Sequence, residues 1–155
     1  MDQLPDIINT DLISKESDRL WQDTSHLLKD LNPRKVVVLS GPFKNEDEES
    51  ALLTKMLAAC KLTPGEYHLI LLQEDDLLAW PLIREATQPS QVILLGVEPS
   101  QLGMAVQFMP HQVSRFDERS WIPSASLSTL IEQPALKNHL WNYGLKPVFI
   151  DKVYG

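Results

Sequence analysis

The stretch Lys35-Val-Val-Val-Leu39, closed by Gly41-Pro42, decides the fold class. It is short and rich in β-branched apolar residues, which is typical of a strand buried on both faces of a parallel sheet. Residues 67–72 and 91–95 repeat this pattern. Because both faces of such strands need cover, the sequence predicts helices between them.

Helical patterns lie where these strands require them. The acidic run at 45–49 leads into apolar residues at helical spacing, and negative charge suits the first turn of a helix. A helix over 77–86 is predicted to contain Pro81, which must kink it or begin a new helix. Leucine spacing predicts three more helices, over 11–31, 127–131 and 134–140.

The order of these elements indicates an α/β fold. Strands that alternate with helices give a three-layer α/β/α architecture with a mainly parallel central sheet. The region after Gly96 is harder to interpret, and residues 105–109 and 112–116 are expected to be further strands. Near the end of the chain, Gly144 can terminate the last helix.

Length and composition bound the domain organisation. The chain has 155 residues, of which 43% are hydrophobic and 23% charged, so a packed core is expected. We predict a single α/β domain over 11–155 and a separable segment over 1–10 that could be mobile. Cys60, the single cysteine, cannot form an internal disulfide, which favours a reducing cytoplasm.

The charge pattern favours a protein partner. The net charge is −7 and the basic residues are scattered, so direct nucleic-acid binding should be weak or absent. The sequence has no run of about 18 apolar residues and no leader pattern, which argues against a membrane partner. We therefore expect a cytoplasmic protein that binds other proteins.

Motifs for cofactors and metals are missing from the sequence. Neither G-x-G-x-x-G nor the Walker spacing occurs, so no nucleotide cofactor is expected. The four histidines have no Cys or carboxylate at ligand spacing, so no metal is expected either. Ligands of open sheets bind beyond the carboxyl ends of the strands. An alternative function, a small-molecule or nucleotide hydrolase, would use Asp75, Glu98 and His111 there.

Three segments together resemble uracil-DNA glycosylases. Residues 37–43 are similar to the first strand and water-activating loop of that family, and residues 92–96 to its central strand. Trp121-Ile-Pro-Ser-Ala-Ser-Leu127 resembles the His-Pro-Ser-Pro-Leu-Ser loop before the last helix of the family. The resemblance spans about residues 36–140 and implies a glycosylase-like α/β/α fold.

The residues that carry the chemistry of that family are replaced in this chain. Gly41 directly precedes Pro42 where the family has an aspartate before proline, and Ile122 precedes Pro123-Ser124 where it has the catalytic histidine. An isoleucine cannot exchange a proton or stabilise a developing charge. The comparison implies degenerate motif positions and a chain with no catalytic residues.

A closer resemblance is to a non-catalytic family of this fold, the psi subunits of the DNA polymerase III clamp loader. Residues 124–141 follow the psi pattern of leucine helix, proline restart and Leu-Trp ending, and residues 51–64 resemble its leucine-rich helix and turn. This implies a non-enzymatic protein-interaction subunit of the DNA replication or repair machinery. Leu4, Ile7 and Ile8 would anchor the chain to the clamp-loader ATPases, and the folded body would bind a chi subunit.

A homodimeric scaffold is the remaining alternative. Trp80, Phe108 or Trp121 would then be exposed and form a hydrophobic interface. Trp121 is for the same reason a candidate contact for any other protein partner.

Overall fold

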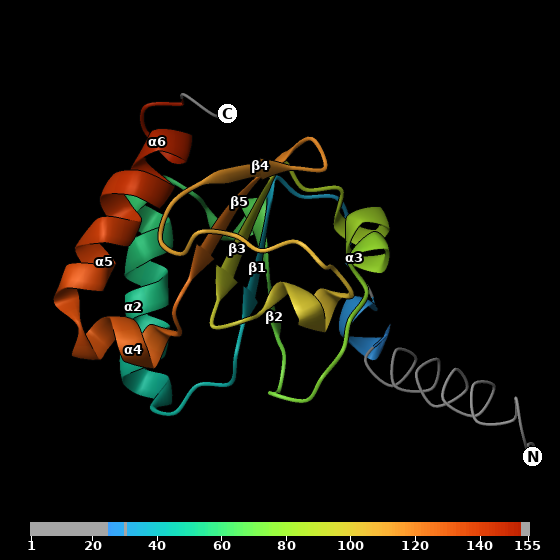
Figure 1. Ribbon diagram of the computed structural model, residues 1–155, viewed down its shortest axis with the longest axis horizontal. Helices are drawn as coiled ribbons and strands as arrows, with labels where there is room; N and C mark the ends of the chain where they lie inside the picture. Colours follow the sequence, from blue (N-terminus) through green and yellow to red (C-terminus); the bar gives the residue numbers. More distant parts are fainter. Residues whose placement is uncertain (1–24, 30, 153–155) are drawn as a thin grey trace, which may run out of the picture.

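A five-stranded sheet in the order β2-β1-β3-β5-β4 forms the centre of the molecule (Figure 1). The computed structural model describes residues 25–29 and 31–152. Four neighbouring strands are parallel, and β4 is antiparallel to β5 at one edge. The strands are β1 Val36–Ser40, β2 Tyr67–Leu71, β3 Gln91–Leu95, β4 Ser114–Phe116 and β5 Arg119–Ser124. The predicted α/β class with a mostly parallel sheet is confirmed.

Helices cover both faces of the sheet (Figure 1). One face carries α2 Glu46–Ala59, α4 Leu127–Glu132, α5 Pro134–Leu140, the π-helix η4 Trp141–Leu145 and α6 Lys146–Phe149. The other carries α3 Trp80–Thr87 and the 3₁₀ turns η1 Ser25–Leu28 and η3 Pro99–Leu102. A third turn, η2 Pro64–Glu66, precedes β2.

The central strands divide their side chains between two cores. Val36 and Val38 face the α2 side, whereas Val37 and Leu39 face the α3 side, and all four are fully buried. This alternation is the two-residue period of a strand. It explains why the run from 35 to 39 is apolar at successive positions, since neither face of β1 meets water.

The strand order reverses between β1 and β3. The chain passes through α2 on one face to reach β2, then returns through α3 on the opposite face to β3, on the other side of β1. Right-handed crossovers require the covering helix to change face when the direction changes. At such a reversal the loops that follow the two strands diverge and leave a crevice.

Two predicted starts and ends of helices need correction. Residues 77–79 are not helical, and α3 begins at Trp80 with Pro81 in its first turn. In that turn a backbone N–H has no partner within the helix, so the N–H that proline lacks is not needed. Gly144 does not end the last helix but lies inside the π-helix that connects α5 to α6. The predicted helix over 11–31 falls largely outside the described residues. In the part of this range that is described, Ser25–Leu28 form a 3₁₀ turn.

The region after Gly96 also differs from the prediction. Residues 105–109 form no strand, whereas Ser114–Phe116 do. Trp121 to Ser124, predicted as a loop, belongs to the buried strand β5. In the described part of the chain, no helix is long and apolar enough to cross a membrane.

Candidate functional site

The segments after β1, β3 and β5 meet at one edge of the sheet. The N–H of Gly41 donates to Leu95 O at 3.0 Å, and the N–H of Gly96 donates to Ser124 O at 2.9 Å. These bonds continue the parallel ladders beyond the last paired residues. The three segments that were expected to correspond to glycosylase motifs are therefore neighbours in space.

Gly96 fits this edge because it has no side chain. Its φ of +73° lies in the left-handed region, and a Cβ there would stand 2.9 Å from Cβ of Ser126. Ser126 caps α4 by accepting a hydrogen bond from the N–H of Thr129. The close approach of the two loops thus brings the start of α4 against the end of β3.

Ile122 was expected to stand at the position of the glycosylase histidine, and its side chain is fully buried. It packs in the core on the α2 side with Ile93, Leu127 and Leu140. Pro123 and Ser124, the next two residues, line a cavity on the other face. The side chain at position 122 is therefore directed away from that cavity.

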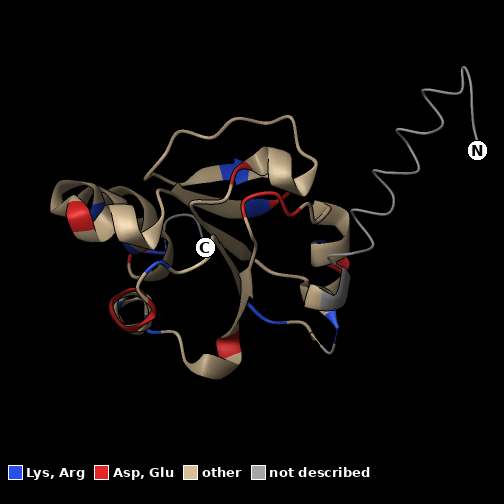
Figure 2. Cartoon of the chain, turned by 90° about the horizontal axis from the view of Figure 1, so that it is seen from below, with Lys and Arg blue, Asp and Glu red and all other residues tan. Residues whose placement is uncertain are grey.

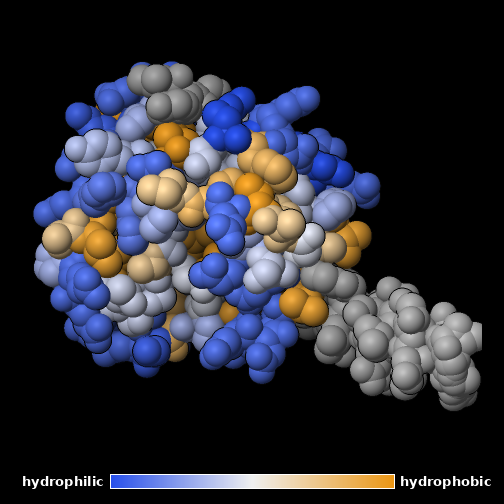
Figure 3. Space-filling view, in the orientation of Figure 1, coloured by the Kyte–Doolittle hydropathy of each residue, from blue (hydrophilic) through white to orange (hydrophobic). Residues whose placement is uncertain are grey.

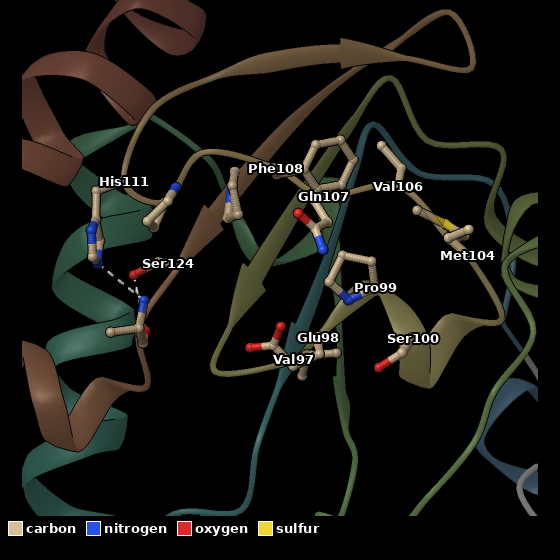
Figure 4. A pocket seen from close by; sticks show the side chains of 14 residues that line it. Val97, Glu98, Pro99, Ser100, Met104, Val106, Gln107, Phe108, His111 and Ser124 are labelled. Carbon is tan, nitrogen blue, oxygen red and sulfur yellow. Dashed lines mark hydrogen bonds between the residues drawn. The ribbon is translucent and has the colours of Figure 1, made fainter.

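A cavity of about 580 Å³ lies beyond the ends of β3 and β5 (Figure 4). Figure 4 shows Glu98 with its carboxylate directed into the cavity and His111 on a separate wall, beside Ser124. Most of the remaining wall is apolar and comes from the segment between η3 and β4, including Met104, Val106 and Phe108. A second hollow of about 490 Å³ shares Glu98 and is bordered by Gly41 and Pro42.

Two of the three candidate catalytic residues thus share one cavity. Asp75 does not line it and is exposed in the loop after β2. Within residues 25–29 and 31–152, no cluster of three or more His, Cys, Asp or Glu side chains could hold a metal ion. Cys60 is buried, and burial raises the pKa of its thiol to about 12, so it is a poor nucleophile.

His111 is held in place by the loop after β5. Its backbone N–H donates to Pro123 O at 2.7 Å, and its ring Nε2 accepts from the backbone N–H of Ala125 at 3.2 Å. The residue has a φ of +63°, an uncommon conformation that these bonds stabilise. Burial lowers the pKa of His111, and the neighbouring His139 lowers it further. A neutral ring is consistent with Nε2 acting as an acceptor.

We expect the stability of the protein to depend on pH through His111. Because its pKa is lower in the folded state than the ordinary 6.5, the unfolded chain takes up a proton first. The contribution of His111 to the free energy of unfolding is complete above pH 6.5 and is lost as the pH falls below that value. Between pH 7.5 and 5.5, the free energy of unfolding in urea should fall less for His111→Asn than for the wild type, because Asn does not take up a proton. Asn is chosen because it tolerates the positive φ at this position.

His139→Gln serves as the control for this experiment, because His139 is exposed and makes no bond to the β5 loop. It should retain most of the pH dependence of the wild type. Equal losses of unfolding free energy in His111→Asn and the wild type would contradict the assignment.

Asp117 is a structural residue whose role the sequence did not reveal. Its carboxylate accepts from Trp80 Nε1 at 2.8 Å and pairs with Arg84 at 2.9 Å and Arg119 at 3.5 Å. The hydrogen bond from Trp80, then that from Arg84, lowers the pKa of Asp117. Asp117 and Glu118 both have positive φ and form the turn between β4 and β5. The turn is thereby tied to α3.

Asp117→Asn is expected to lower the free energy of unfolding by about 1–2 kcal/mol, because the charge-assisted hydrogen bond from Arg84 and the ion pair with Arg119 both lose the carboxylate charge. Asparagine keeps the tolerance for a positive φ, so the backbone of the turn is unchanged. Glu118→Gln in the same turn is the matched control and should have almost no effect. Equal stability of Asp117→Asn and the control in urea would contradict this role.

The prediction that Trp80 and Trp121 are exposed is wrong. Trp80 and Trp121 are buried with 3% and 0% of their surface exposed. Their rings lie 4.6 Å apart, Phe108 stacks on Trp121 at 5.4 Å, and the Trp121 Nε1–H donates to Phe116 O. Trp80 and Trp121 belong to the core on the α3 side and are not exposed contacts, whereas Phe108 packs against this core and is partly buried.

No protein-family model matches this chain, and no curated protein matches it significantly.

Proposed function

We propose that the chain is a non-enzymatic protein-interaction subunit of the DNA replication or repair machinery, with a degenerate glycosylase-like fold, similar to the psi subunits of clamp loaders. The observation that carries the proposal is the meeting of three motif-like segments at one sheet edge. Ser40-Gly41-Pro42, Gly96 and Ser124 lie at the ends of adjacent parallel strands, and backbone hydrogen bonds join them. Segments scattered over the sequence thus make one local arrangement.

The side chains at this edge support a role without catalysis. Gly41 has no side chain where the glycosylase pattern places an aspartate. Ile122 is buried in the opposite core, where it cannot reach a substrate in the cavity. General acid–base chemistry needs a titratable group within hydrogen-bond reach of the reacting atom.

The surface charge supports a protein partner over nucleic acid. Figure 2 shows the described lysines and arginines spread over several elements, while acidic residues gather at the start of α2. Phosphate binding depends on clustered basic side chains. Leu4, Ile7 and Ile8, the proposed anchors for the clamp-loader ATPases, lie outside the described residues.

Two experiments test this proposal. The full chain, tagged in its native cells and crosslinked before purification, should bring down clamp-loader ATPases and a chi subunit at near-stoichiometric amounts. The purified protein, in excess over uracil-containing single-stranded DNA, should release no uracil. Release of uracil at a rate proportional to protein concentration would contradict the proposal, as would a stoichiometric complex that contains no replication or repair protein.

The shared cavity favours one second candidate, a small-molecule or nucleotide hydrolase. Its volume of about 580 Å³ lies within the usual range of small-molecule pockets, roughly 300–1,000 Å³. Glu98 would act as the base, because Nε2 of His111 already accepts from Ala125. Phosphate release from nucleoside triphosphates by the wild type, abolished in Glu98→Gln, would favour this function over the first.

A further inference from the structure

An apolar groove of about 240 Å³ runs between α2 and α5, on the face of the molecule opposite η3. Met56, Leu140 and Leu145 are buried at its floor. Leu52 and Trp141 are only partly buried and form its walls. Figure 3 shows hydrophobic side chains that reach the surface over α5, among hydrophilic neighbours.

The π-helix after α5 shapes this groove. Leu140 and Leu145 are five residues apart and both buried, a spacing that a π turn places on one face. Gly144 allows the turn to press against β5, since a Cβ there would lie 2.9 Å from Cγ2 of Ile122. The wider turn leaves Trp141 on the groove wall. Single π turns are frequent at functional sites.

The groove has a basic rim. Lys55 comes from α2 and Lys137 from α5, so each wall contributes one exposed ammonium group. None of the lining residues is acidic. The chain as a whole has a net charge of −7, whereas this groove combines an apolar floor with two cations. It complements a ligand that is apolar in the middle and negative on both sides.

The size of the groove indicates what kind of ligand fits. Pockets for small molecules usually hold roughly 300–1,000 Å³, and this groove is smaller. One large side chain inserted from a peptide needs less room, and such anchors dominate many protein interfaces. Its position between two helices matches the way grooves receive amphipathic segments.

We propose that this groove binds a short segment of a partner protein in which a large apolar side chain is flanked by carboxylates. The carboxylates would pair with Lys55 and Lys137 while the apolar side chain lies against Trp141. This inference rests on the proposed function as a protein-interaction subunit, and adds where on the folded body a partner is held and by what chemistry.

Fluorescence anisotropy with synthetic peptides tests the inference on the full chain. The probe is a short fluorescent peptide with central Phe and Leu flanked by Asp and Glu; one counterpart has Lys flanks, and another has Ala in place of Phe and Leu. Only the acidic peptide with its anchors should bind saturably. Lys55→Glu/Lys137→Glu should weaken binding about tenfold, from the loss and reversal of two rim charges. Added salt should weaken wild-type binding.

Lys35→Glu/Lys44→Glu is the matched control, because these lysines are exposed and do not line the groove. It should bind the acidic peptide like the wild type, and all variants should unfold at similar urea concentrations. The inference is overturned by absent saturable binding, by equal binding of the lysine-flanked peptide, or by equal affinity of the groove variant. Self-association that the groove variant abolishes would place a second copy there and also overturn it.

The result of the peptide-binding experiment can be distinguished from the result of the crosslinking experiment that tests the proposed function. If the crosslinked chain brings down replication proteins but the acidic peptide does not bind, the groove inference fails alone. If the peptide binds at the groove and no replication or repair protein is recovered, the proposed function fails and the groove remains a site for another partner.

Discussion

Trp121→Ala is expected to lower the free energy of unfolding by about 4 kcal/mol, within the range of large-to-small substitutions at buried aromatic residues. Trp121 is fully buried, and its ring contacts those of Trp80, Phe108 and Phe116. Truncation leaves a cavity among rings from α3, β4 and the segment before β4. It also leaves the Phe116 carbonyl without its donor.

Urea unfolding followed by circular dichroism measures this loss as a shift of the midpoint at an unchanged slope. Trp141→Ala is the matched control, because it makes the same substitution at a partly buried position. Its loss should be less than half as large. Equal losses for both variants would contradict the assignment of Trp121 to the core and reopen its role as an exposed contact.

Ile122→His should produce no base excision and should lower the free energy of unfolding by about 3 kcal/mol. The substitution places the histidine of the proposed glycosylase pattern at position 122, but that position is fully buried. An imidazole there would lose its hydrogen bonds to water and meet only apolar neighbours such as Ile93 and Leu140. It also could not reach a substrate in the cavity on the other face.

Ile122→Val is the control, since it removes one methylene and should cost about 1 kcal/mol. Both variants are measured for unfolding in urea and for release of uracil from single-stranded DNA. Uracil release by Ile122→His, or stability equal to that of Ile122→Val, would show that position 122 faces a site and not the core.

The parts of the fold that the sequence predicts well depend on local patterns. β1 and β3 are buried along their whole length. Burial on both faces requires the run of apolar residues from which the two strands were predicted. The start of α2 is encoded within a few residues, where Asn45 caps the helix and four acidic residues follow. Ser126 and Pro134 similarly mark the starts of α4 and α5.

β5 escaped prediction because it contains a proline and several polar residues. Pro123 is tolerated because Ser124 O faces β3, as its bond from Gly96 shows, so position 123 faces the other side. There β4 pairs only with Arg119–Trp121, and no ladder bond from Pro123 is required. The sequence alone does not reveal how far a neighbouring strand extends.

Local patterns likewise indicated two of the residues that line the cavity. Glu98 and His111 follow strand ends or lie in a loop, which marked them as candidates, and they line one cavity. The bond from Ala125 to His111 and the pairing of Asp117 with Arg84 join residues far apart in the chain. No local pattern encodes such contacts. The burial of Trp121 was missed likewise, since its partners come from three separate segments.

The central claim, that the chain works by binding replication proteins and not by chemistry in its cavity, can be tested by reconstitution. The purified full chain is mixed with purified clamp-loader ATPase subunits and chi from the same organism, and the mixture is analysed by size-exclusion chromatography with light scattering. We predict a single species whose mass includes one copy of the chain. Elution of the chain at its own mass, apart from both partners at micromolar concentrations, would contradict the account.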